Sequence, residues 1–408
     1  MGGGSRVALA ALCCAFFVAS PTAVAASDAD WARGALADQY ELGSSLPLRN
    51  TPWVGTHNSF NSSAEMGRTL SSQDSNQQIT LVDQLNQGVR SLELDVHWFP
   101  SLRGGGFTPV VCHAAELHAG CSAEKPLGVV LRDIAGWLRD HPDQVLMLYL
   151  EDHLDNQAGY DAGAAEVESV LGSMLYRPAG DGSCVALPLD ATRDQMRAAG
   201  AQVIVVSGCG TGSAWPAVAF DWSSSHEEER PHGYRDFPDC GPDFTRADYD
   251  GKLIRYFEDS TKLTAGASAT GAAARDDGIS ASTASAMTRC GVDLLGLDQV
   301  VADDPRFAAL VWSWALGEPR RRPGCAAQYA GRWYSLRCTR RLRVACRLPD
   351  GRWRVPSRLA THSRASAVCK RARGKWDLPR TGFEAQQLRV AMERVRAARA
   401  WVRAHVEE

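Results

Sequence analysis

The sequence predicts an α/β fold in which parallel strands alternate with helices. The stretch RSLELDVHW, residues 90–98, alternates polar and apolar side chains, and Leu92, Leu94 and Val96 form one apolar face, as in a strand covered on both sides. Strand-like and helix-like segments then follow one another as far as residue 175, an order that favours parallel pairing with right-handed crossovers. The economical total is a TIM-type (β/α)8 barrel, which need not be regular, followed by a small Cys- and Arg-rich C-terminal extension.

Each element of this interpretation depends on a local signal. Residues 26–50 show little periodicity, and the stretch 61–78, rich in Ser, Asn and Gln, predicts a loop. Helices are predicted where apolar residues recur at helical spacing, namely over 79–88, 126–141 and 164–175. After a turn at 104–106, further strands are predicted from short apolar runs, namely over 109–113, 145–151, 202–207, 292–298 and 309–314. Residues 209–250 and 265–286 predict no element that can be placed.

Polar side chains stand where the predicted strands end. Glu93 and Asp95 are two residues apart in the strand 90–98 and therefore project from one face. The other residues of this kind are His57 and Asn58 in VGTHNSF, His113 in PVVCH and Glu151 in VLMLYLED. Parallel barrels carry their active sites at the C-terminal ends of the strands. The sequence therefore predicts an active site at these positions.

The chemistry of these side chains indicates a metal-assisted reaction. Four of them offer only oxygen ligands: Asn58, Glu93, Asp95 and Glu151. Carboxylates that share a buried face repel one another unless a cation or protons neutralise them, and hard oxygen donors suit Ca²⁺ best, with Mg²⁺ the less suitable ion. His57 and His113 lie outside this set and provide a general base and a general acid near neutral pH. Together these roles favour metal-assisted phosphodiester cleavage.

Simpler alternatives exist for the same residues. His57 could be a core histidine bonded to backbone, and Glu93 and Asp95 could form structural ion pairs with arginines. Asp152 would take the place of Glu151 if the strand shifted by one residue. Three further histidines are expected to be bystanders: His97, His118 and His153.

The N-terminus and the cysteines predict a secreted protein. Residues 1–25 combine Arg6, an apolar run and the small-residue end Ala23-Val24-Ala25, which is typical of a signal peptide. Its removal leaves ten cysteines, an even number suited to disulfides. A bridge between Cys112 and Cys121 would fix the loop that begins with His113. A zinc site is the competing interpretation, but the chain has no CxxC pair.

The composition changes after residue 318. Residues 319–408 carry 23 Lys+Arg against 6 Asp+Glu, whereas the rest of the chain carries 21 against 41. This basic region has four cysteines, which predict two disulfides, and a helical pattern over 383–405. We therefore expect a barrel over 26–318 and a basic, disulfide-containing region over 319–408. The basic region is either a solvated surface or a patch that faces anionic lipid.

The motifs GTHNS, RSLELDV, VCH and LYLED, in this order, resemble the X-region of phosphatidylinositol-specific phospholipase C, in particular the calcium-dependent bacterial type. The resemblance covers residues 53–151 well and the later barrel loosely. It implies catalysis by the two histidines and calcium binding by the Asn, the ExD pair and the last Glu. By position these are His57, His113, Asn58, Glu93, Asp95 and Glu151.

The resulting prediction is a secreted calcium-dependent phosphodiesterase that cleaves phosphatidylinositol or a related inositol phosphodiester through a cyclic phosphate. Glycerophosphodiester hydrolysis is one alternative, and a non-catalytic lipid- or carbohydrate-binding protein on the same barrel is another. The expected partners are the phosphodiester substrate and an anionic membrane surface in peripheral contact, without nucleic acid. The sequence predicts no oligomeric state.

Overall fold

The computed structural model describes residues 27–66, 74–101, 105–114, 121, 125–179, 182–211, 214–228, 234–241, 251–261, 278–320 and 322–406. Eight parallel strands form the central sheet in the order β7-β6-β5-β2-β1-β10-β9-β8. Their bounds are β1 Trp53–Thr56, β2 Ser91–Pro100, β5 Leu146–His153, β6 Val203–Ser207, β7 Phe220–Asp221, β8 His226–Glu228, β9 Leu253–Phe257 and β10 Leu294–Leu297. The predicted signal peptide lies outside the described residues.

The sheet is curled, with β7 and β8 at its two ends. The α/β class and the parallel order confirm the sequence-based expectation, while a fully closed (β/α)8 barrel is not seen among the described residues. Only two to three residues form each of the end strands. Within the described ranges, no backbone pairing joins β7 to β8.

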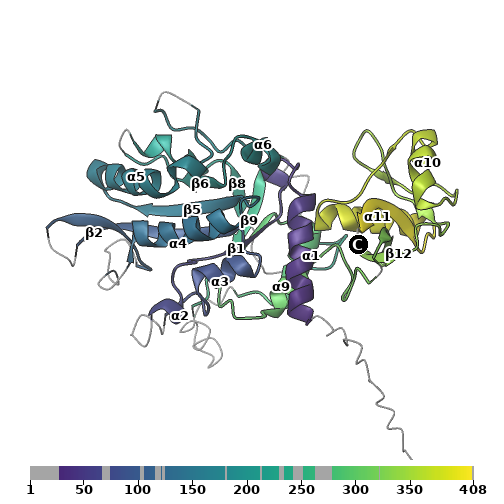
Figure 1. Cartoon of the computed structure of the whole chain (residues 1–408), viewed down its shortest axis with the longest axis horizontal. Helices are drawn as coiled ribbons and strands as arrows, with labels where there is room; N and C mark the ends of the chain where they lie inside the picture. The colour runs from purple at the N-terminus through teal and green to yellow at the C-terminus, as the bar shows by residue number, and fades with distance from the viewer. Residues whose placement is uncertain are drawn as a thin grey trace, which may run out of the picture.

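The two faces of the sheet bury different side chains. Leu92, Leu94 and Val96 of β2 pack in the outer core, as the alternation of the sequence predicts. Trp53, on β1, packs in the inner core between the curled strands. Helices lie outside the sheet (Figure 1). Their bounds are α2 Ser63–Met66, α3 Leu81–Asn86, α4 Leu127–Asp140, α5 Gln157–Leu171, α6 Arg193–Ala198 and α8 Ala281–Cys290.

One predicted parallel strand is antiparallel. β3, Phe107–Val111, forms a hairpin with β2, with Val96 opposite Val111, and the short β4, Lys125–Pro126, pairs with it. A parallel partner requires a crossover of a dozen or more residues, whereas β2 ends at Pro100 and β3 already begins at Phe107. The chain therefore returns along β2 and carries His113 back toward the site.

Two further sequence interpretations were wrong, and one strand had no prediction. The lead-in segment contains α1, Asp28–Leu42, capped by Ser27. The run 309–314 is not a strand, because Asp304 and Pro305 start the helix α9, Pro305–Leu310, whose end takes up its first residues. The strand β9 was missed, because a charged residue, Arg255, interrupts its apolar run.

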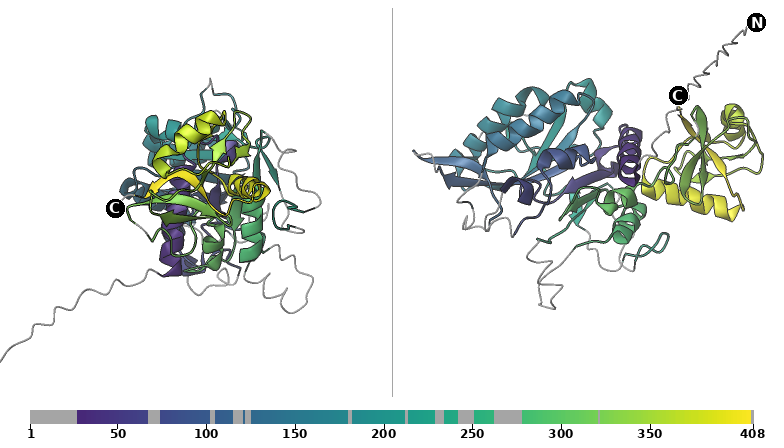
Figure 2. Two further views of the ribbon diagram at one scale, coloured as in Figure 1. Left: turned by 90° about the vertical axis from the view of Figure 1, so that its right-hand side faces the viewer. Right: turned by 60° about the horizontal axis from the view of Figure 1, so that its bottom comes forward.

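The C-terminal lobe, which comprises the described residues from 319 onward, is β-rich and forms its own two sheets beside the central sheet (Figures 1 and 2). It contains a four-stranded sheet, β12-β11-β17-β13, and a three-stranded sheet, β15-β14-β16. The helical pattern over 383–405 is a helix only in its first part, since α11 ends at Arg394 and β17 follows. The bounds are β11 Gly324–Tyr329, β12 Arg332–Leu336, β13 Arg343–Val344, β14 Cys346–Arg347, β15 Trp353–Arg354, α10 Ala365–Arg371, β16 Lys375–Trp376, α11 Gly382–Arg394 and β17 Ala400–Val406.

Disulfides connect all ten cysteines of the described chain. The pairs are Cys112–Cys121, Cys184–Cys209, Cys240–Cys290, Cys325–Cys338 and Cys346–Cys369. The predicted bridge beside His113 and the two predicted within the basic region are therefore confirmed. Zinc ligation by these cysteines is excluded while the bridges are intact.

The C-terminal lobe packs at the N-terminal ends of the central strands. A cavity of about 960 Å³ between the two parts is lined by Pro52, which precedes β1, by Asp293, which precedes β10, and by Arg352 and Phe383 of the lobe. The predicted site residues stand at the opposite ends of the same strands. In the part of the chain that the structure describes, no helix has the length and apolar character required to cross a bilayer.

Candidate active site

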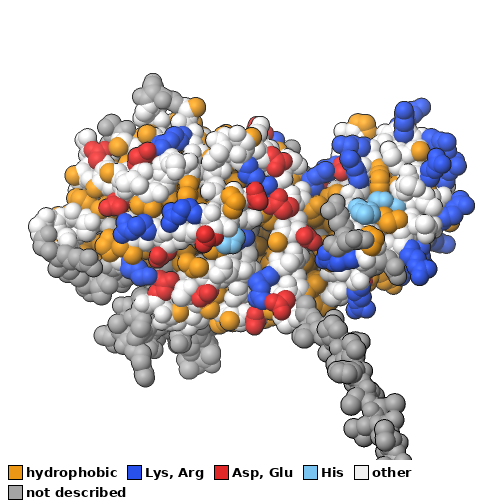
Figure 3. Space-filling view, viewed as in Figure 1, with side chains coloured by type: hydrophobic (Ala, Val, Ile, Leu, Met, Phe, Trp, Pro, Cys, Tyr) orange, Lys and Arg blue, Asp and Glu red, His pale blue; other side chains and the backbone are white. Residues whose placement is uncertain are grey.

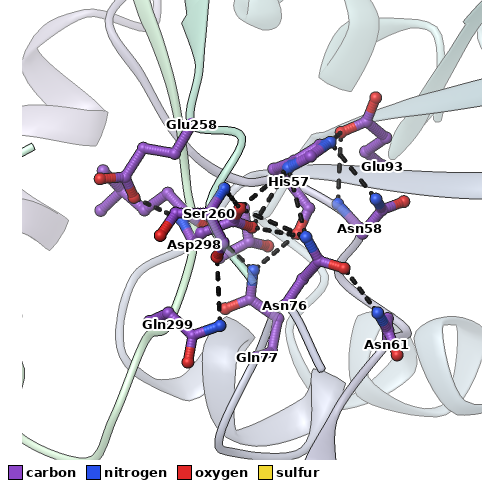
Figure 4. A network of polar contacts seen from close by, with 12 residues as sticks. His57, Asn58, Asn61, Asn76, Gln77, Glu93, Glu258, Ser260, Asp298 and Gln299 are labelled. Carbon is purple, nitrogen blue, oxygen red and sulfur yellow. Dashed lines mark hydrogen bonds and ion pairs between the residues drawn. The ribbon is translucent and has the colours of Figure 1, made fainter. Parts of the chain in front are cut away.

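The candidate site lies at the C-terminal ends of four neighbouring central strands. His57 directly follows β1, and Glu93 and Asp95 belong to the adjacent β2. Glu151 lies on β5, on the other side of β2, and Asp298 directly follows β10. Figure 4 shows His57 between Asp298 on one side and Glu93 on the other. The fold therefore brings residues from distant parts of the sequence to one edge of the sheet.

A buried aspartate orients His57. Nδ1 of His57 lies 3.2 Å from both carboxylate oxygens of Asp298, which is almost fully buried. The same carboxylate accepts hydrogen bonds from the Ser260 amide at 2.7 Å and from the Asn76 side chain at 3.1 Å. Because Nδ1 donates to Asp298, the Nε2 atom of neutral His57 carries the free lone pair. Asp298 was not predicted as a site residue from the sequence, although its place at the end of the apolar run VDLLGLD was the available signal.

Charge near His57 controls its pKa. Burial alone lowers the pKa of the imidazole, but the charges of Asp298 and Glu93 outweigh burial and raise the pKa to about 10. Nε2 of His57 lies 3.8 Å from Oε2 of Glu93. The ring is therefore held between an orienting carboxylate and an acidic cluster.

The carboxylate cluster consists of Glu93, Asp95 and Glu151. Asp95 and Glu151 are in register on adjacent strands, and one oxygen of each of the three carboxylates lies within 4.8 Å of the others. Burial raises the pKa of Glu93 to about 7, and burial together with the charges of Glu93 and Glu151 raises the pKa of Asp95. A hydrogen bond from His153, 3.2 Å away, lowers the pKa of Glu151. Glu93 and Asp95 therefore hold their protons to higher pH than free carboxyl groups do.

Asn58 faces the same cluster from the loop after β1. Its backbone has a positive φ of 43°, and its amide N–H donates to Oε2 of Glu93 at 3.3 Å. With the side-chain amide turned so that its nitrogen faces Asp95, Nδ2 donates to the two carboxylate oxygens at 2.6 and 2.9 Å. The opposite orientation of the amide presents its oxygen to the carboxylates, which is favourable only with a cation between them.

The donor set fits a hard divalent cation. Three carboxylates and one amide oxygen converge on a small volume, and none of these ligands is a thiolate or an imidazole. Glu151 has 42 % of its side chain exposed, so that one side of the cluster is open to water or substrate oxygens. Such a partly open set of oxygen ligands leaves room for the waters that hard divalent cations keep.

The register of β5 distinguishes Glu151 from its neighbour. Asp152 accepts hydrogen bonds from the hydroxyls of Tyr160 and Ser207, at 2.9 and 2.6 Å, and from the Gly208 amide at 3.1 Å. These partners tie β5 to α5 and to the end of β6, away from Asp95. Asp152 therefore has a structural environment, and Glu151 is the residue that faces the cluster.

The β2–β3 hairpin brings His113 within electrostatic range of His57 and Asp298. The Cys112 amide donates to the backbone oxygen of Asp95 at 3.2 Å, and the Cys112–Cys121 disulfide closes the loop that begins with His113. Nδ1 of His113 lies 3.7 Å from a carboxylate oxygen of Asp74. Burial lowers the pKa of His113, and the charge of His57 acts in the same direction. The two histidines are therefore close enough to influence each other's titration.

The predicted bystander histidines have different surroundings. His153 bonds Glu151 and so supports the carboxylate cluster, and the ring of buried His97 stacks on it with centroids 4.4 Å apart. His118 lies outside the described residues. Deeper between the strands, Arg255 lies over the Trp222 ring at 4.4 Å, and its charge lowers the pKa of Glu93. Arg255 thus adds positive charge beneath the cluster, a contribution that the sequence analysis did not anticipate.

The sequence over the central sheet matches a family of phospholipase C-like domains. Residues 14–304 match the family described as "Rv2075c PI-PLC-like domain", where PI-PLC denotes phosphatidylinositol-specific phospholipase C, and the chain belongs to this family. It is 40% identical over 396 residues to the "Uncharacterized protein Rv2075c" of Mycobacterium tuberculosis strain H37Rv and equally to "Uncharacterized protein MT2135" of strain CDC 1551. The match covers 92% of this chain and 81% of each relative.

Solved structures of bacterial phospholipases C are more distantly similar. The phosphatidylinositol-specific enzyme of Listeria monocytogenes has 13% identity and a TM-score of 0.41, covering 65% of this chain and 94% of its own. A Staphylococcus aureus enzyme has 11% identity and a TM-score of 0.45, covering 69% and 98%. A calcium-dependent enzyme from a Pseudomonas species has 16% identity and a TM-score of 0.36, covering 65% and 93%. This similarity is too weak to assign roles to individual residues.

Proposed function

We propose that the protein is a secreted, calcium-dependent phosphodiesterase of the phospholipase C type that cleaves phosphatidylinositol or a related inositol phosphodiester. The observation that carries the proposal is the position of His57, whose Nδ1 is held by Asp298 while its Nε2 faces the carboxylate cluster. An oriented imidazole beside an oxygen-ligand cluster suits removal of a proton from a hydroxyl that attacks phosphorus. The family supports the reaction class.

In the proposed reaction His57 is the general base. Nε2 removes the proton of the inositol 2-hydroxyl, whose oxygen forms a bond to phosphorus while the bond from phosphorus to the glyceride oxygen breaks. His113 donates a proton to that departing oxygen, so that diacylglycerol and an inositol cyclic phosphate are formed. In the slower second step His113 removes a proton from water, whose oxygen forms a bond to phosphorus while the bond from phosphorus to the 2-oxygen breaks. His57 returns its proton to the departing 2-oxygen, so that inositol phosphate is formed. Asp298 stabilises the His57 imidazolium in both steps.

Asn58, Glu93, Asp95 and Glu151 would hold the calcium ion. Bound there, calcium neutralises the carboxylates that raise the pKa of His57 and stabilises negative charge on the phosphoryl oxygens. Magnesium suits the cluster less well, because it requires a tighter octahedral shell and gives up water reluctantly. The carboxylates also keep the substrate hydroxyl and His57 in one charged, partly water-excluded space.

The proposed setting is extracellular. A signal peptide over residues 1–25 and five disulfides are consistent with export, because such bridges persist in oxidising compartments. The lipid substrate requires peripheral contact between the mouth of the site and a membrane surface. That mouth lies at the C-terminal strand ends, opposite the basic C-terminal lobe, so that the lobe cannot be the surface that presents lipid to His57.

The test is a phosphodiester substrate screen with and without calcium, followed by His57→Ala and His113→Ala. Each substitution is expected to reduce turnover by roughly 10²–10⁴-fold, because it removes a general base or acid. His141→Ala is the matched control, since His141 stacks on Trp137 beyond the end of α4 and lies outside the site. Phosphorus NMR should detect the cyclic phosphate, whereas glycerol phosphate without a cyclic product would indicate glycerophosphodiester hydrolysis. Full activity in both site variants would refute the assignment.

A further inference from the structure

The C-terminal lobe carries a concentration of positive charge that the proposed reaction does not use. Figure 3 shows Lys and Arg side chains around the outline of the lobe, while acidic side chains gather mainly on the rest of the molecule. Residues 319–408 contain 23 Lys+Arg and 6 Asp+Glu. Charge of one sign on a folded surface attracts a partner of opposite sign at long range. The lobe is therefore a candidate for binding an anion.

Four of these arginines gather around one recess. The recess has a volume of about 650 Å³ and is lined by Arg320, Arg322, Arg337 and Arg340, together with Glu318 and two residues of β12. All four arginines are exposed, and no described acidic side chain forms a salt bridge with any of them, although Arg322 lies within electrostatic range of Asp38 on α1. We call this surface the arginine recess. Its guanidinium groups are available to an external anion.

A disulfide and a hydrogen-bonded carboxylate build the recess. Cys325 on β11 is bonded to Cys338, which holds the segment with Arg320 and Arg322 beside the segment with Arg337 and Arg340. Oε2 of Glu318 accepts hydrogen bonds from the Arg320 amide at 2.8 Å and from the Ser335 amide and hydroxyl at 3.1 and 2.7 Å. Its charge is thus engaged in fixing the two segments. The four arginines are therefore placed by a rigid scaffold rather than by a loose tail.

The recess belongs to the lobe at the N-terminal strand ends, whereas His57 and the carboxylate cluster stand at the C-terminal ends. A planar membrane bound by the lobe would lie away from the mouth of the site. A flexible polymer chain, in contrast, can bind the lobe and leave the mouth of the site accessible to substrate. Guanidinium groups form paired hydrogen bonds with phosphate oxygens, and a chain with repeated phosphates can contact several arginines at once.

We propose that the arginine recess binds a phosphate-bearing polymer chain, and that the C-terminal lobe engages this chain while the mouth of the site remains free for substrate. The statement about the mouth rests on the proposed function, but the binding of the polymer does not. The site is distinct from the catalytic residues, and none of its arginines contacts them. Salt should weaken binding, because each phosphate contact releases condensed counterions.

The test uses the full-length disulfide-bonded protein and fluorescently labelled inorganic polyphosphate as the probe. In the recess variant, Arg320, Arg322, Arg337 and Arg340 are all changed to Gln. Affinity should fall roughly ten- to several-hundredfold, since an exposed ion pair typically changes affinity by a factor of about two to five. The dependence of the logarithm of affinity on that of salt should also become shallower, by about 0.7 for each lost contact.

The matched control changes four exposed arginines of the lobe outside the recess, Arg358, Arg364, Arg371 and Arg373, to Gln and therefore removes the same charge. Retained affinity in this control, with equal thermal stability of both variants, would support the recess. Equal losses in both variants would show binding by net charge and overturn it. Tight binding of phosphatidylglycerol vesicles without binding of polyphosphate would overturn the choice of a polymer. Both variants should turn over a soluble substrate at the wild-type rate. If the wild-type protein itself shows no turnover, the proposed function fails, but the comparison of polyphosphate affinities still tests the arginine recess.

Discussion

The Asp298→Asn variant tests whether Asp298 acts by orienting His57 or only by stabilising the fold. The asparagine keeps the size of the side chain but presents no anion to Nδ1 of His57, which lies 3.2 Å from both oxygens of Asp298. The rise in the pKa of His57 from 6.5 to about 10 corresponds to roughly 5 kcal/mol of differential interaction, to which Asp298 contributes the largest charge effect. Loss of that share should reduce kcat by roughly 10²–10⁴-fold with little change in KM.

The pH dependence of kcat/KM gives a second test of the orienting role. A variant that only destabilised the fold would leave this pH dependence unchanged. A general base works only when it is neutral, and kcat/KM therefore falls as the pH drops below the pKa of His57. A high pKa of His57 places this fall, the acidic limb of the profile, at high pH. The anion of Asp298 raises that pKa. In Asp298→Asn the pKa of His57 should fall, and the acidic limb should move to lower pH.

The matched control is Asp293→Asn. Asp293 is also buried, lies at the other end of β10 and accepts a hydrogen bond from the Ile254 amide at 2.9 Å. The control should lose stability in thermal unfolding but keep kcat and the position of the acidic limb. Wild-type kcat in Asp298→Asn, or an unmoved acidic limb, would refute the orienting role.

Three further predictions concern the cation and the hairpin. Asp95→Asn should abolish both calcium-dependent turnover and the calcium binding that titration calorimetry measures. The control Asp152→Asn, on the other side of β5, should keep both. Activity that survives exhaustive chelation would exclude a role for the cation. Calcium binding near pH 7 should release protons, because the pKa of Glu93 is about 7 without a cation and falls when one binds, so that affinity weakens as the pH drops below 7. Calorimetry in buffers of different ionisation enthalpy measures this release, and identical heats in all of them would contradict it. Replacement of Cys112 and Cys121 by Ser should cost roughly 2–3 kcal/mol of unfolding free energy and lower kcat by releasing His113, and a variant with unchanged kcat would show that the bridge does not position the histidine.

Local periodicity was sufficient to predict the centre of the site. The alternation in RSLELDVHW placed Glu93 and Asp95 on one face and Leu92 and Leu94 on the other, because side-chain direction along a strand follows from backbone geometry alone. The helix over residues 127–140 was likewise readable from its spacing and from the prolines at its two ends. The sequence by itself therefore determined which residues of β2 share one face and what kind of ligands they offer.

Ambiguous or non-local signals led to the errors. The run 309–314 is apolar and short, so that its period distinguishes neither strand nor helix, and the Asp304-Pro305 start of α9 was the better signal. The direction of β3 depended on the length of the turn before it. In each case the deciding information was a boundary or a connection.

Only the tertiary structure decided what surrounds these residues. Asp298 meets His57 across a separation of 241 residues, through the pairing of β1 with β10, and no local pattern specifies that pairing. The same holds for the choice of Glu151 over Asp152, which the register of β5 against β2 settles. The basic region was predicted from composition, but its position at the far ends of the strands results from packing of whole elements against each other. Sequence sets the direction and chemistry of each side chain, whereas contacts between distant segments depend on which surfaces bury each other most completely.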